Sequence, residues 1–542
     1  LHFLELPLAG GTLTISRSPV KDAGMVNHYK HQLAMGAGGL SLSTDGTITD
    51  GNGTLLVDSN LQVSTAGRDR FIASTGHRWA KMVETSLARE AATPGGVNQW
   101  TASNKIQPRN LPGQVNEYGF DVGNHGSRAW WVVKASTLPF PDFNSTVFDN
   151  NGSNNQQFGR TVATNRNLMA VGRQYDDWGS SQSRKVNLYQ INENNSSLSE
   201  KFVVQPDDLN FDSSRYFGSS LSLDNGFLAV GANSARKENY SGDYTGAVYL
   251  FDVNGSYPTQ TNRVTASDGS SGDYFGSSVD LSRDSLLVGA PYDDEGGYQA
   301  SGSAYLFQRE SNGSLSEVAK LTDPDGDNYD YFGQSVAVEG EFLAVGAHYA
   351  DVIANGSTYS DSGKVLLFRN YAGSVTLTDT LTPPNPSSNT YFGYTIARSG
   401  DFLVVGEYRR TDQYNGAGAA YLYKFSTEGT ATLTATLSSP VPTYNGYYGW
   451  SVAMEGNRLL IGARQEDSEN ATDSGAAYLY SVSAEGKPTL LERFTHPNGK
   501  ADDYFGESVG LSGTNALIGA YQFDLPNNRF NAGSAVLFRE SN

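Results

Sequence analysis

Residues 274–291 read YFGSSVDLSRDSLLVGAP, and residues 302–307 read GSAYLF. In the first stretch Val279 and Leu281 alternate with polar residues, and Leu286–Val288 form a short apolar run. Alternation predicts a half-buried strand, and a short apolar run bounded by turn residues predicts a fully buried one. Together the two stretches predict three consecutive antiparallel strands.

The same pattern recurs seven times along the chain. In every copy an aromatic-glycine step is followed thirteen residues later by a second glycine. The first glycines are Gly159, Gly218, Gly276, Gly333, Gly393, Gly449 and Gly506, and the second are Gly172, Gly231, Gly289, Gly346, Gly406, Gly462 and Gly519. Repeats before the last also carry a fourth strand, as in TLTDTLT at residues 376–382, and the copies start 56 to 60 residues apart. This period predicts an all-β fold with seven four-stranded blades arranged as a β-propeller.

These residues resemble the FG-GAP repeats of the integrin alpha-subunit propeller, in which Phe-Gly opens the first strand and Gly-Ala-Pro closes the second. Phe275-Gly276 with residues 289–291 match well, Gly406-Glu407 departs from the pattern, and the resemblance covers roughly residues 150–542. It implies a seven-bladed propeller. Integrin-type blades often carry a calcium loop between strands one and two, but that link is short here, as in VEGEF at residues 338–342. The chain is therefore similar to the calcium-loop-poor variant found in microbial surface and secreted proteins.

The last repeat ends at residues 534–538 with only three strands, so we expect its fourth strand to come from upstream of the first repeat. AWWVVK at Ala129–Lys134, followed by Ser136–Leu138, is the candidate. Such a clasp would remove the open edge of an incomplete ring. We therefore expect the propeller domain to span residues 129–542, with residues 129–149 as closing strand and linker.

Residues 1–128 predict a separate, small β-rich domain with one helix. The helix is expected over His77–Ala92, where Trp79, Val83, Leu87 and Ala91 recur every fourth residue. The apolar segment Leu1–Leu8 is either an edge strand of its own domain or a strand given to a neighbouring subunit by β-augmentation.

Composition excludes several classes of protein. The 57 acidic and 38 basic residues give a net charge of -19, which is opposite to the field that a nucleic-acid binder needs. The chain has no cysteine, so thiol catalysis and cysteine-ligated metals are excluded. No apolar run is long enough to predict a membrane span. With 60 glycines and 31 tyrosines, the composition is typical of an all-β body that we expect to be secreted or displayed at the cell surface.

The loops between strands two and three, and those joining blades, should share one face of the propeller. In integrins that face meets the ligand, so the resemblance implies the same face here. Aromatic and polar residues on these loops suit a sugar or a protein surface, although tyrosines at loop bases also serve packing. The candidate ligand-binding residues are Tyr175, Trp178, Tyr292, Tyr298, Tyr349, Tyr408, Arg409, Tyr414 and Tyr521.

Two other kinds of site are predicted. The blade-joining loop DPDGDNYD offers Asp323, Asp325, Asp327 and Asp330, either as one calcium site or as a solvated turn. Calcium is thus the one cofactor to test. Ten N-x-Ser/Thr sequons occur, and several fall in predicted turns where glycosylation is permitted. Among them are Asn144, Asn239, Asn254, Asn312, Asn355 and Asn470.

Three functions compete at this point. The first is an extracellular, non-enzymatic adhesion or surface-assembly protein that binds protein or glycan through the loop face. The second is a carbohydrate-active enzyme, a lyase or hydrolase, with Asp294, Asp351, His348 and Arg409 as first candidates. An aspartate five residues past the second glycine recurs in five blades, however, which favours a role in fixing the turn. The third is a subunit of an extracellular filament or layer that self-associates through the N-terminal segment.

Overall fold

The computed structural model divides into two compact units, Leu1–Pro139 and Phe140–Asn542. In the first unit it describes the backbone of eleven strands. In the second it describes residues 143–149, 155–165, 167–173, 185–191, 198–207, 216–236, 243–310, 313–412, 414–468, 471–525 and 529–539. No helix long and apolar enough to cross a membrane occurs in these parts of the chain.

The first unit contains strands and, where described, no helix. Its strands are β1 (Phe3–Leu4), β2 (Leu13–Lys21), β3 (Asn27–Met35), β4 (Leu40–Leu42), β5 (Ile48–Asp50), β6 (Leu55–Val57), β7 (Lys81–Met82), β8 (Glu84–Ser86), β9 (Gln107–Leu111), β10 (Gln114–Gly119) and β11 (Ala129–Lys134). The largest sheet has the order β8-β11-β10-β9, β4-β5-β6 form a second, and β1-β7 and β2-β3 form pairs.

The helix expected over His77–Ala92 is wrong where this stretch is described, because β7 and β8 lie within it. β7 pairs with β1 and β8 pairs with β11. Strand pairing with residues distant in sequence therefore outweighs the helical spacing of apolar residues in this segment. β1 also lies inside the expected Leu1–Leu8 segment and is paired within its own chain.

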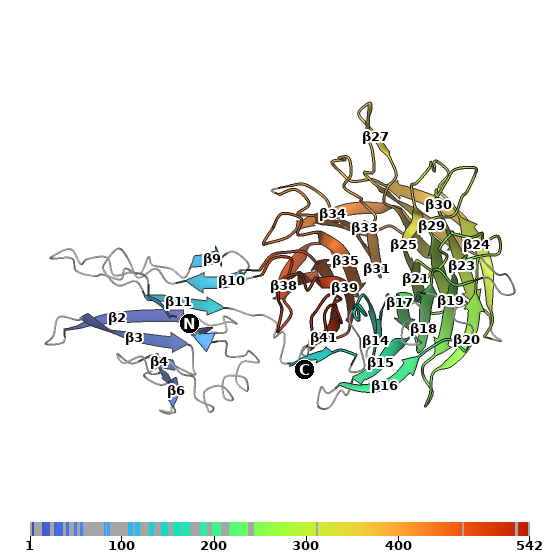
Figure 1. Ribbon diagram of the computed structural model, residues 1–542. Coiled ribbons are helices and arrows are strands. Elements are labelled where there is room, and N and C mark those ends of the chain that lie inside the picture. The colour runs from blue at the N-terminus through green and yellow to red at the C-terminus, as the bar shows by residue number, and fades with distance from the viewer. Residues whose placement is uncertain are drawn as a thin grey trace. The chain divides into compact units, whose positions relative to one another are not determined.

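The second unit is a ring of seven four-stranded antiparallel sheets, as the sequence predicts (Figure 1). Blade 1 consists of β13 (Thr161–Thr164), β14 (Leu168–Gly172), β15 (Val186–Ile191) and β16 (Leu198–Val204), and blade 2 of β17 (Phe217–Asp224), β18 (Phe227–Ala232), β19 (Ala247–Asp252) and β20 (Thr259–Val264). Blade 3 consists of β21 (Ser278–Ser282), β22 (Ser285–Ala290), β23 (Ser303–Arg309) and β24 (Leu315–Leu321), and blade 4 of β25 (Phe332–Glu339), β26 (Phe342–Ala347), β29 (Lys364–Tyr371) and β30 (Ser374–Leu381). Blade 5 consists of β31 (Thr395–Ser399), β32 (Phe402–Glu407), β33 (Ala419–Phe425) and β34 (Ala431–Ser438), and blade 6 of β35 (Tyr448–Glu455), β36 (Arg458–Ala463), β37 (Ala476–Val482) and β38 (Pro488–Phe494). Blade 7 consists of β39 (Phe505–Ser512), β40 (Asn515–Ala520), β41 (Ser534–Arg539) and β12 (Phe143–Val147).

The ring is closed by a strand from upstream of the first blade, but not by the expected one. β12 pairs antiparallel with β41 through five residues, from Phe143 opposite Arg539 to Val147 opposite Ala535. The proposed strand Ala129–Lys134 is β11, which belongs to the sheet of the first unit. The closing strand therefore lies within the expected range of residues 129–149, but it is a more polar segment than Ala129–Lys134.

The paired glycines explain the repeat. Each first glycine has a positive φ, between 85° and 95°, and each second glycine faces the backbone of the next blade. A Cβ atom on Gly289 would lie 1.9 Å from the carbonyl oxygen of Gly333, and one on Gly519 would lie 1.9 Å from that of Gly159. Neighbouring blades therefore approach so closely that a side chain would clash with the next blade's backbone.

A hydroxyl group two residues after the first glycine ties each of six blades to the next. It donates to the carbonyl oxygen of the next blade's first glycine, at 2.7 to 2.8 Å. The pairs are Thr161 to Gly218, Ser220 to Gly276, Ser278 to Gly333, Ser335 to Gly393, Ser451 to Gly506 and Ser508 to Gly159. The last pair joins blade 7 to blade 1 and so completes the circle.

The hydrophobic core is divided among the blade junctions. Each of the seven junctions has its own cluster of buried apolar residues, including the one between blades 7 and 1. The aromatic residue of every aromatic-glycine step is fully buried in these clusters: Phe158, Phe217, Phe275, Phe332, Phe392, Tyr448 and Phe505. Because each blade is packed only against its two neighbours, the loops at the strand ends are left to carry function.

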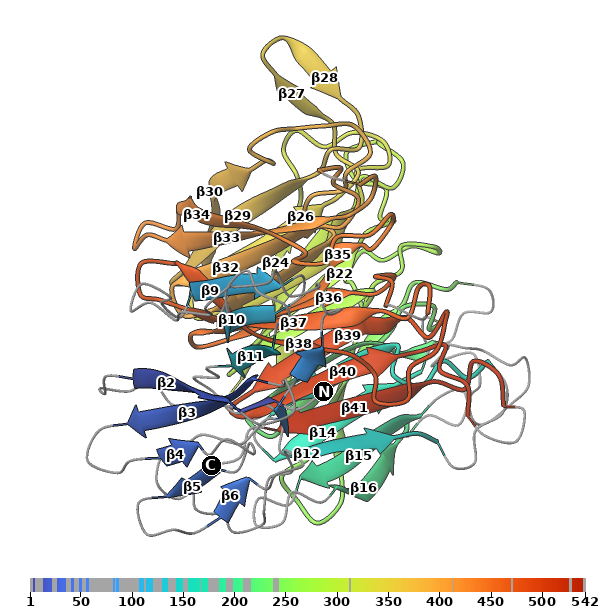
Figure 2. The same cartoon turned by 90° about the vertical axis from the view of Figure 1, so that its left-hand side faces the viewer.

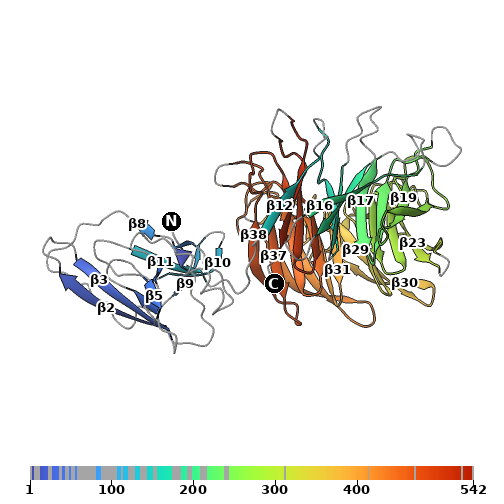
Figure 3. The same ribbon diagram turned by 90° about the horizontal axis from the view of Figure 1, so that it is seen from below.

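Among the described two-three loops, one contains two strands of its own. Between β26 and β29 the chain forms a hairpin of β27 (Val352–Ala354) and β28 (Ser357–Tyr359), which stands out beyond the rest of the propeller (Figures 1 and 2). The sheets of neighbouring blades lie side by side, with loops at both ends of their strands (Figure 3).

Candidate functional site: the loop face of the propeller

The loops between strands two and three lie at the same end of the sheets as the loops that join blades, because the strands are antiparallel. We call this end the loop face. In the six junctions where both are described, the end of the blade-joining loop pairs with the preceding blade's two-three loop. The amide of Phe332 donates to the carbonyl oxygen of Ser301 at 2.9 Å, and the amide of Phe392 donates to that of Ser362 at 2.9 Å. The loops of adjacent blades therefore form one continuous surface.

The residue before each aromatic-glycine step adopts a left-handed backbone conformation in all seven blades. Six of the seven are tyrosines, and their φ values lie between 52° and 63°. They are Tyr216, Tyr274, Tyr331, Tyr391, Tyr447 and Tyr504. A non-glycine residue in this region costs roughly 1–3 kcal/mol and needs support from its surroundings. The blade-to-blade backbone pairing supplies that support.

An aromatic cluster follows from this arrangement and runs across the loop face from blade 3 to blade 6. Its members are Tyr274, Tyr292, Tyr331, His348, Tyr349, Tyr391, Tyr394, Tyr408, Tyr447 and Trp450. The ring centroids of Tyr292 and Tyr331 lie 4.8 Å apart, and those of Tyr349 and Tyr391 lie 4.7 Å apart. Contacts at these distances stabilise the loops against one another.

Burial raises the pKa of four tyrosines of this cluster, among them Tyr331. Burial, followed by the neighbouring Tyr391, raises the pKa of Tyr349 to about 12. Burial also raises the pKa of Tyr394 and that of Tyr408. A protonated phenol both donates and accepts hydrogen bonds, so the cluster offers polar groups on an aromatic base.

His348 lies inside the cluster as a neutral ring. Its side chain is buried, its ring centroid is 4.5 Å from that of Tyr349, and its Nδ1 atom has no hydrogen-bond partner among the described residues. Burial lowers the pKa of His348 to about 3. The ring is therefore uncharged at neutral pH and packs as an aromatic side chain, unlike an exposed general acid or base.

A cation extends the cluster to blade 7. The guanidinium group of Arg464 lies 3.6 Å from the centroid of the Trp450 ring, and its Nη1 atom lies 2.8 Å from Oε2 of Glu507. Arg464 also lies 5.4 Å from the ring of Tyr504, which stacks on Tyr521 at 5.6 Å. The aromatic surface thus continues from blade 6 to blade 7 through a paired charge.

The structure brings together about half of the expected ligand-binding residues. Tyr292, Tyr349 and Tyr408 belong to the aromatic cluster, Arg409 lies over the ring of Tyr391, and Tyr521 stacks on Tyr504. Tyr298 and Tyr414 are exposed and have no ring contact with the cluster among the described residues. Tyr175 and Trp178 lie outside the described residues.

Sequence reasoning missed the tyrosines that precede the aromatic-glycine steps, as well as Tyr394 and Trp450, which follow them directly. The signal was available: aligning the repeats on their first glycine puts tyrosine two residues before it in six blades. These residues adjoin the scaffold motif, and their ring contacts across blades depend on the closed ring.

The recurring aspartates five residues past the second glycine hold the two-three loops. In the four that are described, a side-chain oxygen accepts a backbone N–H from a residue with φ between 47° and 53°. The pairs are Asp294 with Ala300, Asp351 with Asp361, Asp467 with Asp473, and Asp524 with Asn531. Asp294 and Asp351 therefore have a structural role, as their repetition predicts.

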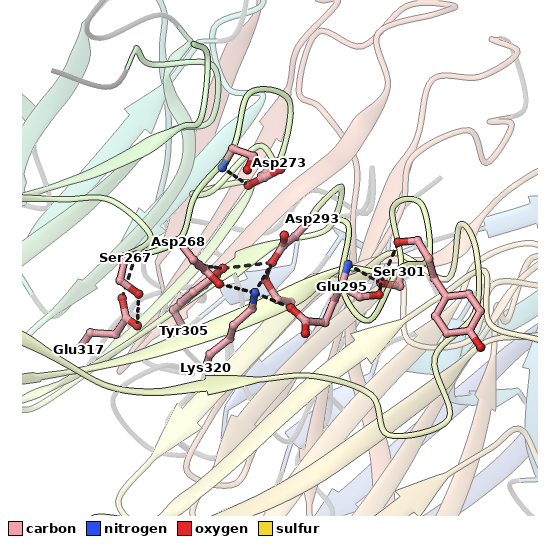
Figure 4. Close-up of polar contacts among 12 residues, drawn as sticks. Ser267, Asp268, Asp273, Asp293, Glu295, Ser301, Tyr305, Glu317 and Lys320 are labelled. Carbon is pink, nitrogen blue, oxygen red and sulfur yellow. Dashed lines mark hydrogen bonds and ion pairs between the residues drawn. The ribbon is translucent and has the colours of Figure 1, made fainter. Parts of the chain in front are cut away.

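A cluster of charged and polar side chains around Lys320 stabilises the loops of blade 3 (Figure 4). The Nζ atom of Lys320, on β24, lies 2.6 Å from Asp268, 2.9 Å from Asp293 and 2.6 Å from Glu295. Burial alone would lower the pKa of Lys320, but hydrogen bonds to these three carboxylates raise it. The hydroxyl of Tyr305 donates to Asp268 at 2.7 Å. One lysine thus neutralises carboxylates from two loops and connects both to the outer strand.

The four aspartates of the predicted calcium loop do not converge. Asp323 forms a buried ion pair with Lys364, with 2.6 Å between Oδ2 and Nζ. Asp330 accepts the backbone N–H of Asp327 at 3.0 Å, and burial raises its pKa to about 6. Asp325 is exposed. No group of three acidic or histidine side chains that could hold a metal ion occurs in the described part of the chain.

Calcium binding at this loop would have to break the ion pair between Asp323 and Lys364. We therefore expect millimolar calcium or EDTA to shift the melting temperature by less than about 2 °C. Differential scanning calorimetry of wild type and Asp325→Ala checks this expectation. A large calcium-dependent rise that disappears in Asp325→Ala would show that the loop rearranges to form a metal site.

The asparagines of the predicted glycosylation sites differ in their structural context. Asn254 and Asn355 are exposed, and Asn355 lies in the turn of the β27–β28 hairpin. Asn144 lies within β12, opposite Phe538, and so is not in a turn. Asn239, Asn312 and Asn470 lie outside the described residues. Glycosylation stays a prediction, which intact-mass measurement before and after glycosidase treatment would test.

Comparison with known proteins identifies the repeat. The family model for the FG-GAP repeat matches residues 258–307, 315–368, 375–423, 432–480 and 489–538. Each match begins near the outer strand of one blade and ends in the third strand of the next. Blade 1 and the first three strands of blade 2 lie outside these matches, and both blades have the same sheet order as the others. The chain is therefore a seven-bladed β-propeller with FG-GAP repeats.

Other comparisons are more distant. A crystal structure of a protein from Lactobacillus plantarum is similar over 69% of this chain and 99% of that chain, with 13% identity and a TM-score of 0.41. No curated protein has significant sequence similarity to the chain.

Proposed function

We propose that the protein is a non-enzymatic binding protein that acts outside the cell or at its surface and contacts a protein or glycan through the loop face. The observation that carries the proposal is the aromatic cluster, which spans several blades and lies on loops except for Trp450, in β35. FG-GAP repeats are typical of extracellular proteins, and this supports the location.

The chemistry of the cluster supports binding. Tyrosine offers a large contact area with few rotatable bonds, and its hydroxyl group forms hydrogen bonds at the edge of that area. Tyr292 keeps 43% of its surface exposed although its ring packs against Tyr274 and Tyr331. A side chain held in place before binding loses little conformational entropy when a ligand arrives.

A triple substitution tests the proposal. Changing Tyr292, Tyr349 and Tyr408 together to alanine is expected to weaken binding at least about 100-fold, because aromatic anchors often contribute 2 kcal/mol or more each. Binding would be measured on glycan arrays and by pull-down, with any retained ligand then titrated by calorimetry. The matched control is Tyr257→Ala with Tyr371→Ala, since both tyrosines are exposed and lie outside the aromatic cluster. Equal binding by both variants would remove the loop face as the binding site.

A further inference from the structure

Arg409 differs from several other arginines of the loop face because it has no carboxylate partner among the described residues. Arg173, Arg464 and Arg493 form ion pairs with Asp149, Glu507 and Glu466 at 2.6, 2.8 and 2.8 Å. Arg410, the next residue in the chain, pairs with Asp412 at 2.9 Å. Arg409 is exposed, in a protein of net charge -19.

The guanidinium group of Arg409 lies over a tyrosine ring. It is 5.5 Å from the centroid of the Tyr391 ring, and its Nη1 atom donates to the Tyr391 hydroxyl at 3.4 Å. The backbone N–H of Arg409 donates to the carbonyl oxygen of Thr390 at 3.4 Å, which connects it to the loop carrying Tyr391. Tyr408 packs against both Tyr391 and Tyr447, at 5.5 and 5.3 Å. The charged group is thus held in place beside tyrosine hydroxyl groups on an exposed side chain.

We propose that Arg409 and the neighbouring hydroxyl groups of Tyr391, Tyr408 and Tyr447 form a subsite for the carboxylate of a uronic acid in an acidic polysaccharide. This inference rests on the proposed function of the loop face. A guanidinium group binds a carboxylate through two parallel hydrogen bonds, and an arginine supported by an aromatic ring is already oriented for this geometry. Tyrosine hydroxyls supply further donors to the same oxygens or to sugar hydroxyl groups.

A polysaccharide fits this surface better than an acidic protein segment does. The aromatic cluster around Arg409 presents tyrosine rings together with their hydroxyl groups, so a sugar ring can stack on them while its own hydroxyl groups form hydrogen bonds. The net charge of -19 repels polyanions at long range, so binding depends on short-range contact at this one cation.

The test uses two probes with the same sugar backbone: oligogalacturonate and its fully methyl-esterified form, which lacks the negative charges. Calorimetric titration of the full chain is expected to show oligogalacturonate binding at least about ten-fold more tightly than the ester. Arg409→Gln should remove this preference, and Arg409→Lys should retain only part of it because an ammonium group lacks the bidentate geometry. Arg283→Gln is the matched control, because Arg283 is exposed in the turn between β21 and β22, at the opposite end of the sheets.

The outcomes separate this subsite from the wider proposal. Equal affinity of wild type for the two probes, or unchanged preference in Arg409→Gln, would overturn the uronate subsite. Binding of poly-glutamate through Arg409, without binding of oligogalacturonate, would overturn the choice of polysaccharide in favour of an acidic protein. If the triple tyrosine variant bound oligogalacturonate as wild type does, the loop-face function itself would fail. If that variant lost all glycan binding while Arg409→Gln kept it, only the subsite would be wrong.

Discussion

Deleting residues 1–147 is expected to unfold the propeller or to lower its melting temperature by more than about 10 °C, whereas deleting residues 1–139 is expected to leave it folded. The first deletion removes β12, whose five residues pair with β41, and with it Val147, a member of the core between blades 7 and 1. Lost ladder hydrogen bonds and lost apolar burial together amount to about 5 kcal/mol.

The two truncations differ by only eight residues, 140–147, so their comparison isolates the closing strand. Circular dichroism melting of both purified proteins measures the effect. The shorter deletion retains the whole second compact unit, Phe140–Asn542. Equal melting temperatures would mean that the ring does not depend on the clasp.

Replacing Gly346 with alanine is expected to destabilise the propeller by about 3 kcal/mol or more. The new Cβ atom would lie 2.1 Å from the carbonyl oxygen of Gly393 in the next blade and 2.5 Å from the hydroxyl oxygen of Ser335. Relief would require the two blades to separate and to break the 2.7 Å hydrogen bond between Ser335 and Gly393. The backbone of Gly346 has no positive φ, so the expected cost comes from blade contact alone.

Gly340→Ala provides the control for that substitution. Gly340 lies in the turn between β25 and β26 of the same blade, has a φ of 61°, and has open space where a Cβ would be added. Its replacement should cost only about 1 kcal/mol, from backbone strain. Urea unfolding of both variants gives the comparison, and a loss at Gly340 equal to that at Gly346 would contradict the proposed blade contact.

The fold could be predicted from the sequence because the glycines required for contact between blades recur at a fixed spacing. The second glycine is required where the next blade's backbone approaches, and the first is required for its positive φ, so their spacing reports the geometry of one blade. Every blade repeats the same contact, and seven copies therefore predict seven sheets.

The closing strand could not be chosen correctly by hydrophobicity. AWWVVK at Ala129–Lys134 is more apolar than FNSTV at Phe143–Val147, yet the latter is the outer strand. Outer strands of this propeller are half exposed and polar, as SVTLTDTL in β30 shows. Comparison with those strands, rather than with buried ones, would have favoured β12.

The binding face could be predicted only in part. Tyr292, Tyr349 and Tyr408 follow the second glycines at nearly fixed positions, so their presence on one face follows from the topology. The contact of Arg409 with Tyr391, and the burial of His348 among tyrosines, depend on how two blades meet. No spacing within one repeat contains that information.

The claim that the loop face is the binding surface is tested most directly by hydroxyl-radical footprinting of the protein with the ligand that the binding screens retain. The account predicts reduced oxidation of Tyr292, Tyr349 and Tyr408 in the complex. It also predicts unchanged oxidation at the opposite end of the sheets, where a cavity of about 510 Å³ is lined by residues such as Leu168, Lys201 and Val253. Protection confined to that cavity, with the three tyrosines unprotected, would contradict it.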